Sequence, residues 1–373
     1  MSDTSNIKRK MAFVIPSLGS GGAERVVSTL ANELSAFYDV TIICFTKTDP
    51  FYKLGTNVKL LYCVDHIAPS TNMIQAIKSN YMLLKKLTKH LKKEKADVCI
   101  GFLTSANVLS ALASKWVKIP CIISERIDPK NSKVNKFWDS LRRYCYKKAT
   151  YLVVQTEEIK AYFANYFPGD HIYILQNPIN RELTEKRNGH QYPKENFILN
   201  VGRLNDQKGQ DTLIEAFSEM KNQEWKLLIV GEGKNRKPYE ALISKLQLHE
   251  KVELIGSTKD ISSYYNKAGI FAFTSRFEGF PNALIEAMHF GVPSISTNCP
   301  TGPSEIIKHG ENGFLIPVDD KEELKAGLNE LITNPEKRNK FSIEGMKSVE
   351  KFKSDNVIKQ WDELIKRCLS SRT

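Results

Sequence analysis

The chain has 373 residues, of which 41% are hydrophobic and 26% are charged. This composition is typical of a soluble globular protein, and the length exceeds what one ordinary core holds, so two domains are expected. No apolar run approaches the ~18 residues that are needed to cross a bilayer. The first residues contain no apolar core of a secretion signal, which argues against export. These features predict a cytoplasmic protein without a membrane span.

The net charge of +12 is concentrated in the first half of the chain. Residues 1–180 carry +11 (25 basic minus 14 acidic), and residues 181–373 carry +1 (29 minus 28). Two basic clusters account for most of the excess. The first holds Lys85, Lys86, Lys89, Lys92, Lys93 and Lys95; the second holds Lys130, Lys133, Lys136, Arg142, Arg143, Lys147 and Lys148, with Trp138, Tyr144 and Tyr146 among them. A solvated basic face is one interpretation. Attraction to the anionic inner face of the plasma membrane is the other, and it predicts a peripheral membrane location.

Apolar, β-rich runs alternate with helical patterns along the first half. The expected strands are Met11–Pro16, Val40–Phe45, Val58–Tyr62, Val98–Phe102, Cys121–Ser124, Tyr151–Val154 and Ile172–Leu175. Between the first two, residues 23–34 repeat apolar side chains at i, i+3, i+4 and i+7, which predicts an amphipathic helix. Strands that are apolar throughout indicate a parallel sheet covered on both faces, so residues 1–178 are expected to form a Rossmann-like domain. Single cysteines in these runs (Cys44, Cys63, Cys99 and Cys121) are expected to be reduced core thiols.

A glycine-rich turn, Gly19–Gly22, follows the first expected strand. Glycines such as Gly21 and Gly22 let a backbone approach a ligand closely, and the start of the next helix favours phosphate. The spacing matches neither a dinucleotide fingerprint nor a Walker loop. A plain tight turn explains the same residues equally well.

Residues 178–195 interrupt the alternation with Pro178, Gly189 and Pro193, and we interpret them as a linker. A second series of strands follows, at Phe197–Val201, Lys226–Val230, Val252–Ile255, Ile270–Phe273, Ser294–Ser296 and Phe314–Ile316, with residues 320–371 mostly helical. Residues 196–352 therefore predict a second Rossmann-like domain. Two such domains facing each other would leave a cleft at the carboxyl ends of both sheets, where ligands bind in open α/β folds.

Three turns at strand ends of the second half contain residues suited to a diphosphate ligand. The turn Gly202–Gly209 carries Arg203 and Lys208, which can bind a diphosphate bidentately and as a point charge. The structural alternative is that this basic turn only caps the helix expected over residues 209–221. Gly231 ends the next strand and leaves room for the backbone near a ligand. Gly256 ends the third strand, and the main chain of that turn is suited to reading the edge of a base.

The segment from Glu278 to Met288 is the most informative of the chain. Pro281 suits the first position of a helix, so the amides of Asn282, Ala283 and Leu284 are expected to point out of the helix start toward an anion. Glu278 precedes this point, and Glu286 lies about 7 Å further along the axis at ~1.5 Å per residue. A nucleotide-sugar, with hydroxylated groups on both sides of a diphosphate, fits these three features; a capped surface helix is the alternative.

The chain contains no Asp-x-Asp motif of the kind that holds a divalent metal against phosphates. Arg203, Lys208 and helix amides would then neutralise the leaving diphosphate, which predicts a metal-independent reaction without a cofactor.

With these segments, the chain resembles the retaining glycosyltransferase family 4 of the GT-B fold, in which two Rossmann-like domains face each other across a cleft. Gly19–Arg25, Gly202–Gly209, Gly231–Gly233 and Phe277–Gly291 carry the resemblance, and residues 300–317 extend it over nearly the whole chain. It implies that Glu286 holds the ribose, that Glu278 and Phe280 lie at the donor sugar, and that Arg203 and Lys208 take the diphosphate. It further implies retention of anomeric configuration and a final helix within residues 353–373 that packs back on the first domain.

One departure from that family concerns the acceptor side. Many relatives carry a histidine after the strand that matches Cys121–Ser124, whereas this chain has Glu125 and Arg126. These two residues are expected either to contact the acceptor or to form a structural ion pair.

The resemblance predicts an enzyme that transfers a hexosyl or N-acetylhexosaminyl group from a UDP-sugar to a lipid-linked saccharide during bacterial surface-polysaccharide synthesis. A non-hydrolysing nucleotide-sugar epimerase of similar fold is the alternative enzyme. A nucleic-acid-binding protein is a third hypothesis, disfavoured because the basic clusters lack the interleaved stacking aromatics of single-strand binders.

Overall fold

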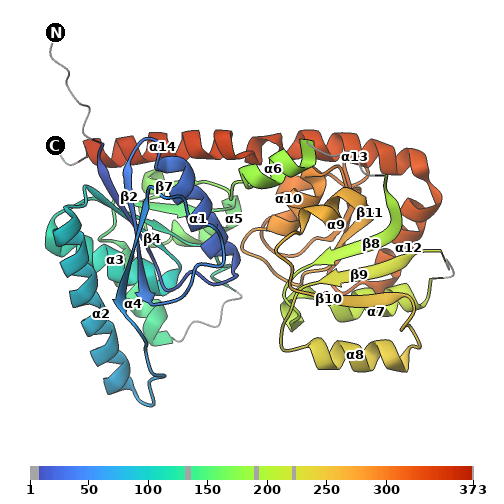
Figure 1. The fold of residues 1–373 in the computed structure, drawn as a ribbon, viewed down its shortest axis with the longest axis horizontal. Helices are drawn as coiled ribbons and strands as arrows, with labels where there is room; N and C mark the ends of the chain where they lie inside the picture. Colours follow the sequence, from blue (N-terminus) through green and yellow to red (C-terminus); the bar gives the residue numbers. More distant parts are fainter. Residues whose placement is uncertain (1–7, 131–135, 189–192, 221–223, 372–373) are drawn as a thin grey trace, which may run out of the picture. The chain divides into compact units, whose positions relative to one another are not determined.

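The structure is a computed structural model that describes residues 8–130, 136–188, 193–220 and 224–371. The chain divides into two compact units. The first comprises Met1–Pro178 together with Asp355–Thr373, and the second comprises Ile179–Ser354. Each unit is a parallel sheet with helices on both faces (Figure 1).

The first unit contains a seven-stranded sheet in the order β3-β2-β1-β4-β5-β6-β7, with every neighbouring pair parallel. The strands are β1 Lys10–Ile15, β2 Asp39–Thr46, β3 Val58–Val64, β4 Val98–Phe102, β5 Cys121–Ser124, β6 Tyr151–Val154 and β7 Ile172–Ile174. All seven predicted strands are therefore present, within two residues of the predicted ends. The continuous apolar runs form because both faces of each strand are covered.

Two groups of helices cover the faces of this sheet. One face packs against α1 (Gly22–Leu34) and α14 (Ser354–Ser370), which contribute Leu30 and Trp361 to its core. The other packs against α2 (Met73–Glu94), α3 (Thr104–Val117), α4 (Lys136–Tyr146) and α5 (Glu157–Phe163). The short η1 (Gly169–His171) precedes β7. The last helix of the chain thus completes the core of the first unit.

The second unit contains a six-stranded parallel sheet in the order β10-β9-β8-β11-β12-β13. Its strands are β8 Glu195–Val201, β9 Lys226–Val230, β10 Val252–Gly256, β11 Ala268–Phe273, β12 Ser294–Thr297 and β13 Phe314–Ile316. Its helices are α6 Arg181–Asn188, α7 Gln210–Ser218, α8 Arg236–Lys245, α9 Ser262–Lys267, α10 Asn282–His289, α11 Pro303–Ile306, α12 Lys321–Thr333 and α13 Pro335–Val349, with short η2 Asp206–Lys208 and η3 Glu350–Phe352.

The interpretation of residues 178–195 as a linker is wrong for most of that segment. Residues Arg181–Asn188 form α6, and Ile179 and Leu183 are buried in the core of the second unit. The helix expected over residues 209–221 is shorter, because it begins after Gly209 and ends at Ser218. The apolar side chains of Ile179 and Leu183 are sufficient to dock α6 on the core of the second unit.

Each sheet has one point at which the strand order reverses. In the first unit this point lies between β1 and β4, and in the second it lies between β8 and β11. Loops leaving the carboxyl ends of the two central strands diverge there, which opens space for a ligand. The predicted turns Gly19–Gly22 and Gly202–Gly209 both follow the first strand at such a point.

Two further properties concern the whole described chain. None of its described helices is both long and apolar enough to span a bilayer. All seven cysteines are free and buried, in agreement with core thiols.

Candidate active site

The turn after β8 is held in place by the end of the neighbouring strand β11. Gly209 closes the turn at φ +60°, and a Cβ atom there would lie 2.2 Å from the carbonyl oxygen of Thr274. The Thr274 hydroxyl donates to the carbonyl of Lys208 at 2.9 Å. Glycine is therefore required at this position both for its backbone conformation and for the close approach.

The two cations of this turn have different environments. Lys208 Nζ donates to Glu278 Oε1 at 2.5 Å, and their side chains are 19% and 8% exposed. Arg203 is exposed, and no residue in the described part of the chain forms an ion pair with it. Lys208 therefore already has an anionic partner, whereas Arg203 has none among the described residues.

Glu278 is fixed by two hydrogen bonds besides that from Lys208. The Ser275 hydroxyl donates to the same carboxylate oxygen at 2.6 Å, and the Thr301 hydroxyl donates to the Glu278 carbonyl. The carboxylate is thus preorganised next to an ammonium group at the carboxyl end of β11. A group of this kind can accept a hydrogen bond from a sugar hydroxyl without reorganising.

The start of α10 differs from the prediction. Pro281 precedes the helix at φ −85° and ψ 70°, an inverse γ-turn, in which the Asn282 N–H donates to the Phe280 carbonyl at 3.0 Å. The Leu284 N–H donates to the Pro281 carbonyl, also at 3.0 Å. The expectation of three outward amides is therefore wrong for Asn282 and Leu284. Of these three amides, that of Ala283 is the one without an acceptor among the described residues.

Glu286 and Phe280 were both expected to contact the donor, but their side chains have different environments. Glu286 is 5% exposed, and the Tyr265 hydroxyl donates to its Oε2 at 3.1 Å, so its carboxylate is oriented. The Phe280 side chain instead packs in the apolar core, 5.5 Å from the ring of Phe352. Only the backbone of Phe280 is left for a ligand. The donor-contacting roles of both residues stay predictions.

The three strand-end turns that the sequence placed at one edge do contact one another through their backbones. The Gly231 N–H donates to the Gly256 carbonyl at 2.9 Å. Gly231 has φ +151°, and a Cβ atom there would lie 2.0 Å from the carbonyl oxygen of Gly202. Gly256, at φ +87°, likewise favours glycine. These glycines are needed for packing between turns, whether or not a ligand lies beside them.

Arg276 connects several loops at this edge of the sheet through hydrogen bonds, a role that the sequence did not predict. Its Nε donates to Asp319 at 2.8 Å, its Nη1 to the Asp206 carbonyl at 2.6 Å, and its Nη2 to Asp211 at 2.9 Å. These hydrogen bonds, first of all that to Asp211, raise the pKa of the guanidinium. The partners lie 43 to 70 positions away, so no local pattern could have indicated the cluster.

In the first unit, Glu125 occupies a closed polar network. It is 1% exposed; it accepts hydrogen bonds from the Tyr146 hydroxyl and from Thr104 Oγ1, the latter at 3.1 Å. Burial raises its pKa, while the charge of Arg142 and these hydrogen bonds oppose the rise. An ion pair between Glu125 and Arg126, the structural alternative, is absent from the described residues.

Arg126 points to the other face of the sheet. Its Nη1 donates to Asn177 Oδ1 at 2.6 Å, and its guanidinium carbon lies 4.9 Å from the ring centre of Phe102 and 5.8 Å from that of Trp361. The side chain is 8% exposed, and burial lowers its pKa to about 9. Adjacent residues of the sequence thus serve opposite faces.

Gly21 and Gly22 begin α1 after β1, as predicted. Gly21 has an ordinary φ of −77°, and a Cβ atom there would clash with the Glu24 side chain at 2.1 Å. The acidic residue in the first turn competes with a phosphate for this helix start. The diphosphate-binding role of these two glycines stays a prediction.

Comparison with known proteins agrees with this geometry. A family model described as "Glycosyltransferase Family 4" matches residues 20–183, and one described as "Glycosyl transferases group 1" matches residues 182–348. The amylovoran biosynthesis glycosyltransferase AmsD of Erwinia amylovora is 31% identical over 357 residues, which cover 93% of this chain and 96% of AmsD. The chain belongs to the family 4 glycosyltransferases.

A second relative of this glycosyltransferase has a more specific name. The α-1,4-N-acetyl-D-galactosaminyltransferase of Campylobacter jejuni that is named for a diphospho-undecaprenol-linked GalNAc disaccharide acceptor is 32% identical over 360 residues, covering 95% of this chain and 98% of the relative. Among solved structures, HepE of Anabaena in complex with UDP superposes with a TM-score of 0.78 at 18% identity, covering 96% of this chain and 100% of HepE. The structural likeness establishes a GT-B fold of two Rossmann-like domains.

The first basic cluster of the glycosyltransferase is exposed, as predicted. Lys85, Lys86, Lys89, Lys92 and Lys93 lie on α2, and Lys95 follows it at φ +53°. In the described parts of the chain, none of them forms an ion pair with a carboxylate. The sequence did not predict that the first half of the same helix exposes large apolar side chains, which are Met73, Ile74, Ile77, Tyr81 and Met82.

The second basic cluster is only partly a basic face. Arg142 is 2% exposed and donates to Asp139 at 2.5 Å, and Tyr146 is fully buried. These two residues therefore contradict an interfacial helix with basic and aromatic side chains turned outward. Lys133 lies outside the described residues, as do the side chains of Lys136 and Trp138. Arg143 is exposed but is paired with Asp139.

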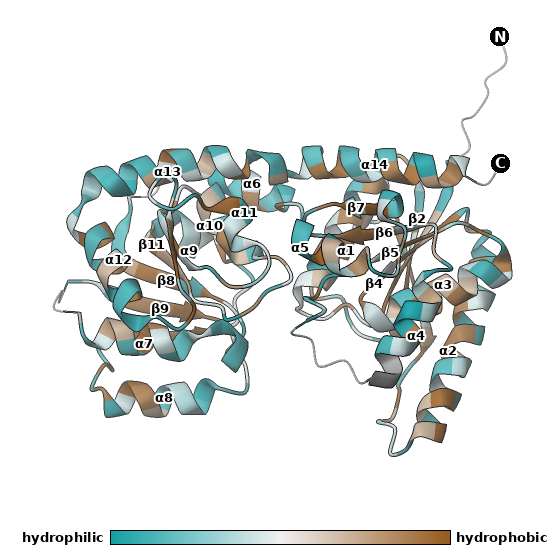
Figure 2. Ribbon diagram, turned by 180° about the vertical axis from the view of Figure 1, so that it is seen from behind, coloured by the Kyte–Doolittle hydropathy of each residue, from teal (hydrophilic) through white to brown (hydrophobic). Residues whose placement is uncertain are grey.

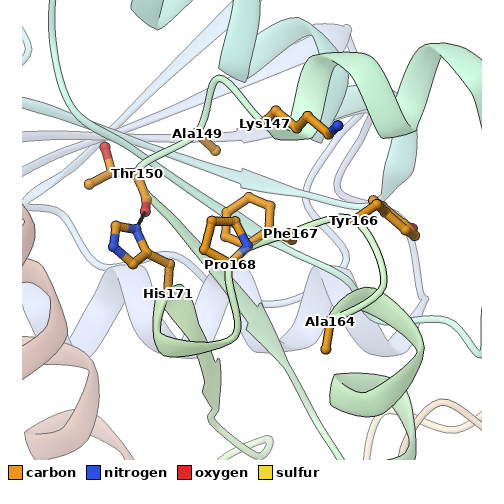
Figure 3. Close-up of a pocket in the computed structure, with 8 residues that line it drawn as sticks. All are labelled: Lys147, Ala149, Thr150, Ala164, Tyr166, Phe167, Pro168 and His171. Carbon is orange, nitrogen blue, oxygen red and sulfur yellow. Dashed lines mark hydrogen bonds between the residues drawn. The ribbon is translucent and has the colours of Figure 1, made fainter.

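A hollow of about 600 Å³ lies in the first unit (Figure 3). It is lined by Lys147, Ala149, Thr150, Ala164, Tyr166, Phe167, Pro168 and His171, and the ring of His171 is hydrogen-bonded to the Thr150 carbonyl at 2.9 Å. These residues directly precede β6 and β7, so the hollow is at the amino edge of the sheet. Ligands of open α/β folds bind at the opposite edge, so we do not assign the hollow to the transfer reaction.

Proposed function

We propose that the enzyme transfers a hexosyl or N-acetylhexosaminyl group from a UDP-sugar to a saccharide carried on a lipid diphosphate. The transfer is proposed to retain the anomeric configuration and to need no metal or cofactor. One observation supports this most: the Lys208–Glu278 pair joins the turn after β8 to the turn after β11, at the reversal point of the second sheet. The choice of UDP is supported by HepE, a solved structure of the same fold in complex with UDP.

The donor would be bound through charges and hydroxyl contacts of the second unit. Arg203, free of any carboxylate among the described residues, would bind the diphosphate bidentately. Glu286 would accept from the ribose hydroxyls, and Glu278 from a hydroxyl of the sugar. Lys208 would share its protons between Glu278 and the β-phosphate as negative charge develops there. These contacts stabilise the leaving diphosphate without a divalent cation.

The acceptor is proposed to reside at a membrane, with α2 as the docking element. Its first half exposes Ile74 (67%) and Ile77 (53%), and its second half carries lysines without an ion-pair partner among the described residues. Figure 2 shows brown, hydrophobic turns along α2. Insertion of each isoleucine into lipid would contribute about 1.5–3 kcal/mol, and each lysine near an anionic surface about 1 kcal/mol. The enzyme would then be peripheral on the inner face of the plasma membrane, where lipid-linked acceptors are reached.

Transfer from radiolabelled UDP-GlcNAc, UDP-GalNAc, UDP-Glc and UDP-Gal to a polyprenyl-diphosphate-linked saccharide tests the proposal. We expect one donor to label the lipid fraction, with undiminished rate in EDTA and an α-anomeric product by NMR. Conversion of the donor without an acceptor would instead identify an epimerase. Salt-sensitive nucleic-acid binding that survives Glu286→Gln, with no transfer, would support the third hypothesis.

A further inference from the structure

A group of buried hydrogen-bond donors lies at the carboxyl edge of the first sheet without acceptors. They are Nε and Nη2 of Arg126, Nε2 of Gln155 and Nε1 of Trp361. All three side chains are more than nine-tenths buried, at 8%, 1% and 0% exposure. Buried polar groups of folded proteins are paired in the great majority of cases, so several unpaired donors near one another indicate a missing acceptor.

Strand alternation places these donors on one face of the sheet. Val153 is in the core beneath α14, so Gln155, two residues on, points to the same face. Arg126 follows β5 and donates a hydrogen bond to Asn177, which follows β7. Since β6 lies between these two strands, the Arg126 side chain crosses the carboxyl end of β6, where Gln155 is located. Trp361 of α14 lies over the guanidinium, at 5.8 Å. Arg126, Gln155 and Trp361 therefore share one face of the sheet at its carboxyl edge.

The nearby charge of Glu125 offsets only part of the effect of burial on the Arg126 guanidinium. Arg126 has no ion pair with any carboxylate in the described chain, and the oxygens of its neighbour Glu125 are bonded on the opposite face. A buried cation without an ion-pair partner is unfavourable, and burial accordingly lowers the pKa of Arg126. Three neutral or cationic donors without a single anionic acceptor are complementary to an oxyanion.

We propose that Arg126, Gln155 and Trp361 form an oxyanion-binding subsite of the first unit, which takes the phosphate or carboxylate group of the acceptor. The inference rests on the proposed function, because the acceptor is identified there as a saccharide on a lipid diphosphate. It goes beyond the expected role of Arg126 by adding two donors and by naming the chemical group that they bind. Gln155 and Trp361 are not suggested by any sequence motif.

The test uses two variants that each remove a donor, Gln155→Met and Trp361→Phe. Because the Gln155 N–H groups have no acceptor in the folded chain, Gln155→Met should not lower the melting temperature without ligand. Trp361→Phe also removes part of a buried ring, so its response is measured against its own ligand-free melting temperature. The probe is inorganic pyrophosphate, added to protein that also carries Arg203→Ala, so that the donor-diphosphate site does not respond. We expect pyrophosphate to raise the melting temperature in the Arg203→Ala background, and each added substitution to remove at least half of that rise.

A parallel arm with glucuronate distinguishes the two sources of the oxyanion. A response to pyrophosphate alone assigns the lipid diphosphate, and a response to glucuronate assigns an acidic sugar of the acceptor. No rise with either probe, or a rise that both variants retain, would overturn the subsite. So would variants that melt lower without ligand and retain the rise, since the donors would then hold structural water.

The subsite and the proposed function fail in different ways. If pyrophosphate stabilises the protein through these donors but no UDP-sugar is transferred, the subsite stands and the acceptor assignment falls. If lipid-linked saccharide is glycosylated with an unchanged acceptor KM in both variants, the function stands and the subsite falls. For a subsite that works as proposed, we expect that KM to rise about tenfold or more, with a smaller effect on kcat.

Discussion

The two cations of the β8 turn allow a prediction that separates catalysis from stability. Arg203→Ala removes an exposed side chain without an ion pair in the described structure, so the free energy of unfolding should change by no more than about 0.5 kcal/mol. Loss of one group that stabilises a leaving anion typically lowers kcat by about 10²–10³, or ~2.7–4 kcal/mol. Arg203→Ala should therefore be folded and nearly inactive.

Lys208→Ala should be inactive and also less stable. It leaves the carboxylate of Glu278, 8% exposed, without its ammonium partner. Removal of one member of a buried pair costs about 3–5 kcal/mol, and the lower end applies because the Lys208 side chain remains 19% exposed. At about 2–4 °C per kcal/mol for a unit of this size, the melting temperature of the second unit should fall by about 6–12 °C.

The matched control is Lys234→Ala, which breaks an exposed pair with Asp206 on the same sheet edge. Exposed pairs contribute little to stability, so this variant should melt and react like the wild type. The assay combines thermal unfolding with the initial rate of sugar transfer. An Arg203→Ala enzyme with full activity, or a Lys208→Ala enzyme with an unchanged melting temperature, would refute the reasoning.

Three other perturbations have defined outcomes. Burial lowers the pKa of His289 to about 4, below its unfolded value of about 6.5, so the unfolded chain binds more protons between these values. Stability should fall by up to about 3 kcal/mol as pH drops from 6.5 to 4, and urea denaturation of His289→Gln at pH 7 and pH 5 should show a smaller difference. Gly231→Ala places a Cβ atom 2.0 Å from a carbonyl oxygen at φ +151°, so it should destabilise by several kcal/mol and yield little soluble protein. Ile74→Ser with Ile77→Ser should weaken sedimentation with phosphatidylglycerol vesicles while the melting temperature stays constant; equal vesicle binding would favour a merely solvated helix.

The parallel sheets could be predicted because their signal is local. Each strand is a short apolar run, and burial on both faces makes the run continuous. The position of Lys208 next to Glu278 was also accessible, since parallel strands end at a common edge and both residues follow central strands. Sequence periodicity is sufficient for such features because the fold repeats one simple unit.

The features that could not be predicted depend on contacts between distant segments. Arg276 gains its role only when residues 43 to 70 positions away meet it. Arg142 was taken for a surface charge, but it is buried beside Asp139 because α4 turns that side of the helix toward the sheet. Pro281 was expected inside α10, but the γ-turn that it adopts uses the next amide. In each case a tertiary contact overrode a local preference.

The return of α14 to the first unit has a consequence for biosynthesis. The Tyr38 hydroxyl bonds Asp362 across 324 positions, and Trp361 fills the core beneath β4. The first unit therefore lacks part of its interior until the ribosome has added roughly 180 more residues, about 10–35 s of elongation at 5–20 residues per second. The second unit is continuous in the chain and can fold during that interval. Nascent chains of this enzyme should thus expose an uncovered apolar sheet face to chaperones, and they should become protease-resistant in reverse order of synthesis.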